Sequence, residues 1–395
     1  MANIPLLVLI GALVLGIFSG ILPGLHPNSI GAILIDIFGN NEILPIVLIL
    51  ILGVHSALAF LPSIFLGIPE GQTQIALLPG QRMFREGRGV EAAVVCAISV
   101  LVATVVSIIS IPFIFPHIPA IFEFVKPWIG HILVFASAVL LANERKLGRM
   151  GRAAIVFLLA GAVGGIALDM PMNEPLFALF VGFFTMPILL GGELRQKIPE
   201  KKVKQDYSLG YLPYVLLGVV LGAVADLLPG ISTPAQIAVF TSVLFGMGSA
   251  RNFLAHVAAI EASHNVFALA SAAGVGIARV GMVAMANNIS PINERNLPVL
   301  AGGFLLAIGI GAFLLVRMGK ILGGKINQID MDALSKALAV YLLLMIFLSD
   351  GILGVAVLAV ATVVGFLPRI WGIGRTHVMG SLIIPSTLHA FGLCP

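Results

Sequence analysis

Long apolar runs, each separated from the next by a short polar segment, constrain this 395-residue chain more than any other feature of its sequence. Hydrophobic residues make up 59% of the chain and charged residues 10%, whereas a soluble globular chain carries about 25% charged residues. A helix needs about 20 apolar residues to cross the hydrocarbon of a bilayer. The sequence therefore predicts an all-α polytopic membrane protein and excludes a soluble domain, a disordered chain, a coiled coil and a nucleic-acid binder.

The apolar runs fall into two groups on either side of a polar stretch. The first group is predicted near residues 4–22, 43–67, 90–115, 128–142, 153–168 and 176–190. The second group is predicted near residues 211–228, 251–272, 298–317, 336–349, 351–368 and 378–392. Two shorter apolar pieces, 29–38 and 235–248, are expected to be half-helices or re-entrant segments. The first run has no basic flank and no small-residue cleavage site, so we expect a retained span and not a secretory signal.

The two groups resemble each other in order and in sequence. The segment from Leu22 reads LPGLHPN and the segment from Leu228, 206 residues later, reads LPGISTP. The pattern GxxSAxxFL at Gly53 recurs at Gly246. We interpret this as an internal duplication, with a first repeat at residues 1–192, a cytoplasmic linker at 193–210 and a second repeat at 211–395.

Lysine and arginine are expected to collect in cytoplasmic loops. In the first repeat they follow the runs ending near 142 and 190, at Arg145, Lys146, Arg149, Arg152, Arg195, Lys197, Lys201, Lys202 and Lys204. In the second repeat they follow the runs ending near 317 and 368, at Arg317, Lys320, Lys325, Lys336, Arg369 and Arg375. The two patterns are out of phase, which predicts an inverted-topology repeat in the cytoplasmic membrane with both termini outside.

Each repeat contains a break rich in proline and glycine that follows an apolar run. Proline removes N–H donors and glycine permits unusual dihedrals, so a helix ends here and the N-terminus of another is exposed. Two such helix starts carry partial positive charge and would suit an anion; Ser29, Ser232 and Thr233 could cap them. The alternative is a pair of turns at the membrane surface. The predicted anion-binding residues are Pro23, Gly24, Leu25, His26 and Asn28 in the first break and Pro229, Gly230, Ser232 and Thr233 in the second.

Ionisable residues inside the apolar runs are the candidates for ion coupling, because charge at membrane depth is costly. Glu261 and His264 are three residues apart and share one face of a predicted helix. Asp226 stands just before the second break, and Glu70 lies in the polar sequence PEGQTQ. The alternatives are a buried structural network for Glu261 and His264 and a solvated loop for Glu70. The single Glu-x-x-His motif lacks the second copy that a di-metal site needs, so no metal site is predicted.

Signatures of soluble enzymes and ATPases are missing from the sequence: it contains no Walker loop, no GxSxG, no HExxH and no dinucleotide fingerprint after a strand. The two cysteines, Cys96 and Cys394, have no metal-binding or redox spacing. We therefore expect no enzyme activity and no cofactor, apart from a coupling cation, a proton or sodium.

Three segments resemble a known family. They are PGLHP from Pro23, LPGQRMFREGRG from Leu78 and FTMPILL from Phe184. These are similar to the large membrane subunit of tripartite tricarboxylate transporters, the TctA family, and most of all to its shorter archaeal relatives. The resemblance implies a permease that moves a small carboxylate with an ion gradient, with a small membrane subunit and an extracytoplasmic binding protein as partners.

The sequence thus predicts an ion-coupled secondary transporter for a small anionic solute, a di- or tricarboxylate, held between the two breaks. Two alternatives stay open. Paired Pro-Gly breaks also resemble polyprenyl-phosphate translocases of the DUF368 type, which would take a lipid phosphate from the membrane. An intramembrane enzyme could instead use Glu261 and His264 on a lipid substrate.

Overall fold

The computed structural model describes residues 5–22, 25–39, 41–67, 77–144, 146–191, 205–227, 237, 241, 247–325 and 330–393. These residues form helices joined by loops and contain no strand. Helices α1 to α11 with their short 3₁₀ and π segments are α1 (Leu6–Ile21), α2 (Pro27–Phe38), α3 (Leu44–Leu58), α4 (Phe60–Phe65), α5 (Leu77–Arg85), α6 (Gly89–Ile114), η2 (Phe115–His117), α7 (Ile118–Val125), η3 (Lys126–Trp128), α8 (Ile129–Ala142), α9 (Leu147–Asp169), α10 (Pro175–Phe180), η4 (Val181–Thr185) and α11 (Met186–Leu190). The later ones are α12 (Leu212–Leu227), α14 (Ala250–Val275), α15 (Gly281–Ile289), α16 (Leu297–Lys325), α17 (Met331–Trp371), η7 (Arg375–Met379) and α18 (Gly380–Ala390).

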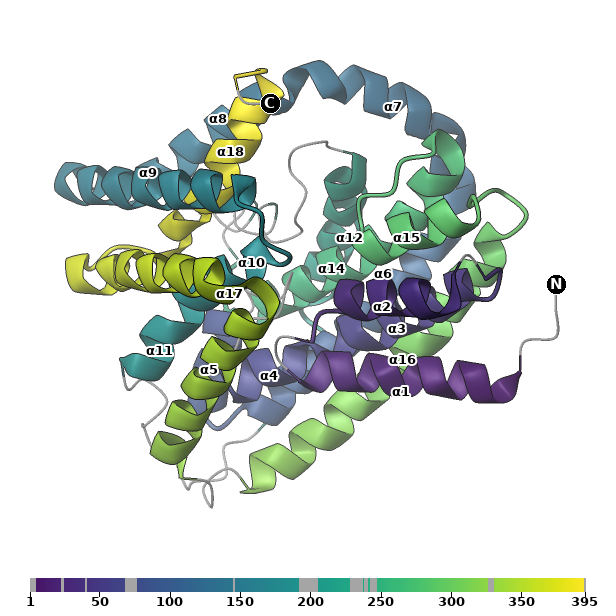
Figure 1. The fold of residues 1–395 in the computed structure, drawn as a ribbon, viewed down its shortest axis with the longest axis horizontal. Helices are drawn as coiled ribbons and strands as arrows, with labels where there is room; N and C mark the ends of the chain where they lie inside the picture. The colour runs from purple at the N-terminus through teal and green to yellow at the C-terminus, as the bar shows by residue number, and fades with distance from the viewer. Residues whose placement is uncertain are drawn as a thin grey trace.

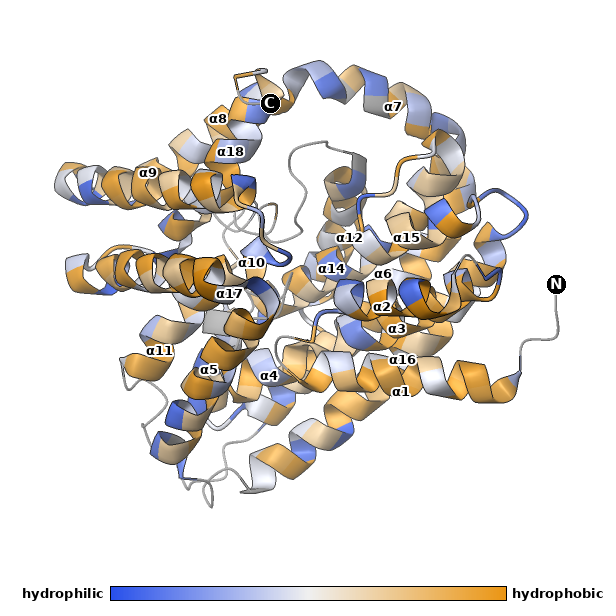
Figure 2. Cartoon of the chain, in the orientation of Figure 1, coloured by the Kyte–Doolittle hydropathy of each residue, from blue (hydrophilic) through white to orange (hydrophobic). Residues whose placement is uncertain are grey.

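Among the described residues, six helical stretches are long and apolar enough to cross a membrane. They are Leu44–Phe65, Gly89–Ile121, Leu147–Asp169, Ala250–Val275, Leu297–Gly324 and Asp332–Trp371. Figure 2 shows apolar residues along these helices and polar residues at helix ends and in loops. The all-α polytopic membrane fold predicted from the sequence is confirmed.

The helices pack in two groups (Figure 1). One group holds α1 to α6, α12 and α14 to α16, and the other holds α8 to α11, α17, η7 and α18. Helix α7 arches over the top of the view in Figure 1 and leads from the first group to the second. Helix α7 was not predicted from the sequence as a separate element.

Each group contains helices from both halves of the sequence, and these pack against one another. In the first group α3 packs on α16 and α14 packs on α6; in the second α9 packs on α18 and α17 packs on η4. Each of these four contacts joins a helix from before the linker to one from after it. Most of the hydrophobic core is therefore shared by the two predicted repeats, whose helices interleave in both groups.

Packing of α1 on α3 and of α12 on α14 fixes a register between the halves. A Cβ added at Gly16 would lie 2.8 Å from the Cβ of Val54, and one added at Gly222 would lie 2.8 Å from that of Ser263. Val54 and Ser263 therefore occupy matching places, so that His55 matches His264. The GxxSAxxFL patterns at Gly53 and Gly246, which the sequence analysis paired, differ from this register.

Two of the expected spans lie within α17 and meet at a kink. Helix α17 covers the runs 336–349 and 351–368 in a single element, but Gly351 within it has φ 62° and ψ −146°. This backbone conformation suits glycine and kinks the helix. The predicted half-helix 29–38 is confirmed as α2, while its partner 235–248 lies almost entirely outside the described residues.

Candidate functional site

The start of α2 forms the described part of the first Pro-Gly break. His26 is the N-cap of α2, and its Nδ1 accepts a hydrogen bond from the backbone N–H of Asn28 at 3.2 Å. Pro27 at the first helical position has no N–H to satisfy. Ser29, which the sequence analysis proposed as a cap, instead donates from Oγ to Glu174 Oε1 at 2.9 Å. Leu25 is partly buried beside His26, and Pro23 and Gly24 lie outside the described residues.

A second histidine stands behind this break. His55 on α3 is buried, its Nδ1 lies 3.2 Å from Ser19 Oγ on α1, and its ring lies 6.1 Å from the ring of His26. Two imidazoles and a hydroxyl thus lie together where α1 ends and α2 begins. A neutral imidazole carries one N–H donor and a hydroxyl carries one O–H donor, which makes this cluster able to face an anion.

The predicted coupling residues of the second half are all buried. Asp226 on α12 is 1% exposed, and Glu261 and His264 on α14 are 5% and 1% exposed. Asp226 Oδ1 lies 3.8 Å from His264 Nε2, and Asp226 Oδ2 accepts a hydrogen bond from Ser271 Oγ. The structure therefore brings Asp226 and His264 together, although 38 residues separate them in sequence.

Glu261 belongs to the same helix but faces a different partner. Its Oε1 accepts a hydrogen bond from Asn265 Nδ2 at 3.2 Å, and Asn265 Nδ2 also donates to Ser56 Oγ on α3 at 3.0 Å. In the register of the two halves, Ser56 and Asn265 occupy matching positions. This hydrogen bond therefore joins the halves at the centre of the first helix group.

Several polar atoms in this region make no hydrogen bond within the part of the chain that the structure describes. They are Asp226 Oδ1, both ring nitrogens of His264 and Asn265 Oδ1. A buried polar group without a partner costs about 1–3 kcal/mol, so such a cluster is rare unless it has a use. A proton shared between Asp226 and His264 would satisfy two of these atoms.

The connection between α14 and α15 carries residues that the sequence analysis did not single out. Arg279 donates from Nε to the backbone carbonyl of Asp226 at 2.5 Å. Gly281, the first residue of α15, lies directly against Asn28, because an added Cβ there would be 2.6 Å from the amide atoms of Asn28. This short connection thus touches the first break with one residue and the helix end that leads to the second break with another.

The residues of the second break, Pro229, Gly230, Ser232 and Thr233, lie outside the described residues, as does Glu70. Their predicted roles stay predictions. In the described ranges, no group of three or more histidine, cysteine or acidic side chains could hold a metal ion. Glu261 and His264 share a helix, yet their side chains contact Asn265 and Asp226 respectively.

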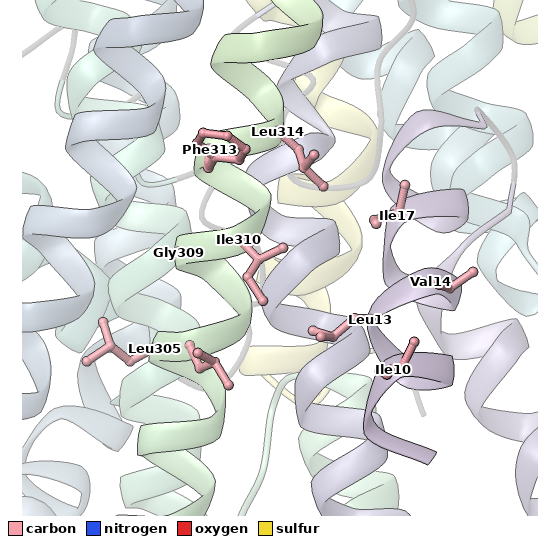
Figure 3. A pocket seen from close by; sticks show the side chains of 10 residues that line it. Ile10, Leu13, Val14, Ile17, Leu305, Gly309, Ile310, Phe313 and Leu314 are labelled. Atoms are coloured by element: carbon pink, nitrogen blue, oxygen red, sulfur yellow. The ribbon is translucent and has the colours of Figure 1, made fainter. Parts of the chain in front are cut away.

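A groove of about 650 Å³ between α1 and α16 has a different character (Figure 3). Side chains that line it include Ile10, Leu13, Ile17, Ile310 and Phe313, all of them apolar. Ile10 and Phe313 are 46% and 62% exposed, so the groove opens on the outer surface of the helix bundle. Its lining suits hydrocarbon and not an anion.

Comparison with known proteins assigns the chain to a family. The family described as "Tripartite tricarboxylate transporter TctA family" matches residues 6–380. The chain is 26% identical to the uncharacterized protein MJ1079 of Methanocaldococcus jannaschii over 399 residues, which covers 97% of this chain and 98% of that protein. No solved structure matches the chain. Because the family match covers almost the full length, the chain belongs to the tripartite tricarboxylate transporter TctA family, a family of membrane transporters.

Proposed function

We propose that this protein is an ion-coupled permease for a small anionic solute, a di- or tricarboxylate, bound between the two Pro-Gly breaks. The observation that carries the proposal is the connection between α14 and α15. It contacts Asn28 of the first break through Gly281 and the end of α12 through Arg279. An anion held there would be close to imidazole, amide and guanidinium donors within an otherwise apolar bundle.

Ion coupling in this proposal rests on Asp226 and His264, with Glu261 as a further buried acid. The pair is at most 1% exposed and lies next to the end of α12, where the second break begins. Ionisable groups at this depth commonly form proton or ion pathways. The coupling cation is therefore a proton or sodium.

Membership of the family supports the partners. We expect the permease to work in the cytoplasmic membrane with a small membrane subunit and an extracytoplasmic binding protein, as the tripartite family name implies. Both termini are expected outside. Membrane lipid surrounds the apolar outer faces of the helices.

The first test is thermal unfolding of purified protein in detergent with succinate, citrate and tricarballylate. A ligand at a hundred times its dissociation constant stabilises the folded state by about 2.7 kcal/mol. We expect a rise in the unfolding temperature that His26→Ala and Thr233→Val reduce, since each removes a proposed anion contact. Uptake of the same acid into proteoliposomes with an imposed ion gradient then tests transport. If none of the acids shifts the unfolding temperature, the proposed substrate class is wrong.

A lipid phosphate is the second candidate substrate, and the groove in Figure 3 is the observation in its favour. The groove runs along α1, which ends at the first break, so an acyl or prenyl chain there could place a phosphate near His26. A thermal shift with geranyl phosphate and none with the acids would favour this candidate. Replacement of the exposed lining residue Phe313 by Ala would then weaken binding of geranyl phosphate and leave acid binding unchanged.

A further inference from the structure

Arg279 lies beside Asp226 at the end of α12, where its positive charge could also interact with a bound anion. Its Nε is bound to the main-chain carbonyl of Asp226, which fixes the guanidinium beside the last turn of α12. The charge of Arg279 interacts electrostatically with the Asp226 carboxylate and with the His264 imidazole. Arg279 itself is partly exposed, whereas Asp226 and His264 are buried.

The charges of this group must balance, because an uncompensated charge away from water is costly. An ionised Asp226 beside Arg279 is neutral as a pair. One carboxylate group of the substrate that binds Arg279 adds one negative charge to the same small region. A proton on Asp226 or on His264, whose facing atoms are 3.8 Å apart, restores the balance.

We propose that Arg279 binds a carboxylate of the substrate and that this releases Asp226 to take up a proton with His264, so that anion and proton move together. This inference rests on the proposed function, because it assigns the coupling ion and an anion-binding residue to the same site. The proton comes from the aqueous phase, bonds to Asp226 Oδ1 or His264 Nε2, and leaves when the anion is released. A planar guanidinium with a fixed fork of donors suits a carboxylate better than an ammonium does.

Other titratable groups near α12 lie elsewhere. Helix α14 supplies His264 and Glu261, which is bound to Asn265. Toward its start it supplies Arg251, which pairs with Asp206, and His256, which is bound to Tyr214 O and Thr241 Oγ1. Helices α6 and α7 also pack on α12. Their titratable side chains and that of the turn between them are Glu91, Cys96, His117 and Glu123. Glu91 is paired with Arg88, Cys96 is a buried thiol, and His117 and Glu123 are exposed.

The test counts protons during binding. Detergent-purified protein is titrated calorimetrically with succinate, citrate, tricarballylate and geranyl phosphate in two buffers of different ionisation enthalpy, at a pH where succinate is fully ionised. We expect the wild type to take up about one proton per bound anion. Asp226→Asn is expected to bind the same anion with proton uptake near zero and with little dependence on pH. Arg279→Gln is expected to bind it about 10- to 100-fold more weakly, the loss for a hydrogen bond between charged groups.

Matched variants separate binding from folding. Arg295→Gln removes an exposed arginine from the loop after α15 and should leave affinity unchanged. Arg279→Lys keeps the charge but loses the fork, so we expect an intermediate affinity. The double variant Asp226→Asn with Arg279→Gln leaves no unpaired charge; it should unfold at a temperature near that of the wild type and bind the anion about as weakly as Arg279→Gln alone.

Wild-type affinity in Arg279→Gln, or full proton uptake in Asp226→Asn, would overturn this inference while the proposed substrate class stands. Binding of geranyl phosphate alone, lost in Arg279→Gln, would keep the role of Arg279 and overturn the carboxylate assignment. If the wild type binds none of these probes, the proposed function is wrong and this inference falls with it.

Discussion

Glu91 shows how this apolar bundle accommodates a fully buried carboxylate. Its side chain is 0% exposed, and Arg88 donates to both of its oxygens, from Nε at 3.0 Å and from Nη2 at 2.5 Å. The N–H of Asp206 donates to Glu91 Oε2 at 2.9 Å, and Arg251 Nε lies 3.8 Å from Oε1. The hydrogen bond to Glu91 raises the pKa of Arg88. These contacts fasten the end of the linker and the start of α14 to the start of α6.

Removal of Arg251 should therefore cost far more stability than removal of an exposed arginine. We expect Arg251→Gln to lower the free energy of unfolding by about 2–4 kcal/mol, because it leaves Glu91 and Asp206 with less positive charge. Arg82 pairs with Glu86 at the surface, where Arg82 is 75% exposed. Arg82→Gln should cost less than about 1 kcal/mol. Unfolding in detergent followed by circular dichroism measures both, and equal losses would contradict the assignment.

The residues of the candidate site were predictable only in part. Asp226, Glu261 and His264 stand out in the sequence because charge is scarce in apolar runs, and the structure buries all three. The meeting of Asp226 with His264 follows from close packing of α12 on α14 at Gly222, which no sequence spacing reveals. Arg279 was missed because it follows a glycine at a helix end, where an arginine normally points into water. Ser56 was missed because one serine in an apolar helix carries no signal of its partner, Asn265.

Glycines in the second helix group act as contact points between α9 and α18. A Cβ at Gly164 would lie 1.9 Å from the backbone oxygen of Ser381, a distance that no side chain can occupy. One residue further, a Cβ at Gly165 would meet nothing closer than Pro385 at 3.9 Å. Small residues let membrane helices approach closely in this way.

Gly164→Ala is accordingly expected to lower the free energy of unfolding by about 1–3 kcal/mol, since α9 and α18 must separate. Gly165→Ala introduces the same methyl group at the neighbouring position and should be neutral or slightly stabilising, because alanine favours the helix. The unfolding temperature of the two purified variants decides the matter. A similar loss in both would mean that the helix contact at Gly164 has no special role.

Glu144 and Asp350 each bind a loop that belongs to the other half of the sequence. Glu144, just after α8, accepts a hydrogen bond from the N–H of Gly374 at 2.7 Å and lies 2.9 Å from His377 Nε2. Asp350, at the kink of α17, accepts from the N–H groups of Asn173 and Glu174 at 2.6 and 3.0 Å. The two acids are 206 residues apart in sequence, so matching positions of the two halves make reciprocal contacts.

The contact of Glu144 predicts acid sensitivity. Burial raises the pKa of Glu144, but the hydrogen bond from Gly374 and the contact with His377 outweigh this and lower it below the ordinary 4.5. A lowered pKa in the folded state stabilises the protein fully above about pH 4.5, and this stabilisation is lost as the pH falls through the folded-state value. Glu144→Gln should cost about 1 kcal/mol at pH 7. It should also flatten the fall of the unfolding temperature below pH 5, and an unchanged acid profile would contradict the role.

Element boundaries were the part of the fold that the sequence predicted best. Runs of apolar residues ended where the helices end, as at Gly89 and Asp169, because the polar loop residues cannot be buried in hydrocarbon. The runs predicted at 336–349 and 351–368 correspond to the two parts of α17, which meet at the non-helical backbone of Gly351. Helix α7 was missed because Pro116 and Pro119 flank its start and its apolar stretch is too short to span.

At the scale of the whole molecule, helix α9 separates the two acids that hold the loops. Glu144 precedes the start of α9, while Asp350 binds Asn173 and Glu174 beyond its end. A helix of 23 residues is about 35 Å long, enough to cross a bilayer. Matching positions of the two halves therefore lie at opposite ends of a membrane-spanning helix, which supports the proposed inverted repeat.

Contacts between loops agree with the charge pattern. Arg152 Nη1 donates to Trp371 O, and Arg369 Nη1 donates to Gly191 O. These pairs join three basic segments that the sequence assigns to the cytoplasm. The same face of the molecule thus collects positive charge from both halves, as expected for the side that stays in the cytoplasm.

Thiol labelling tests the inversion with one matched pair of sites. Lys146 and Ile352 are 206 residues apart, and both are exposed in the structure. In a protein with Cys96→Ala and Cys394→Ser, Ile352→Cys should react with a membrane-impermeant maleimide in intact cells. Lys146→Cys should react only after the membrane is permeabilised, because its basic loop is retained inside. A parallel duplication would place both residues on the same side, so equal labelling of the two in intact cells would contradict the inverted topology and the placement of both termini outside.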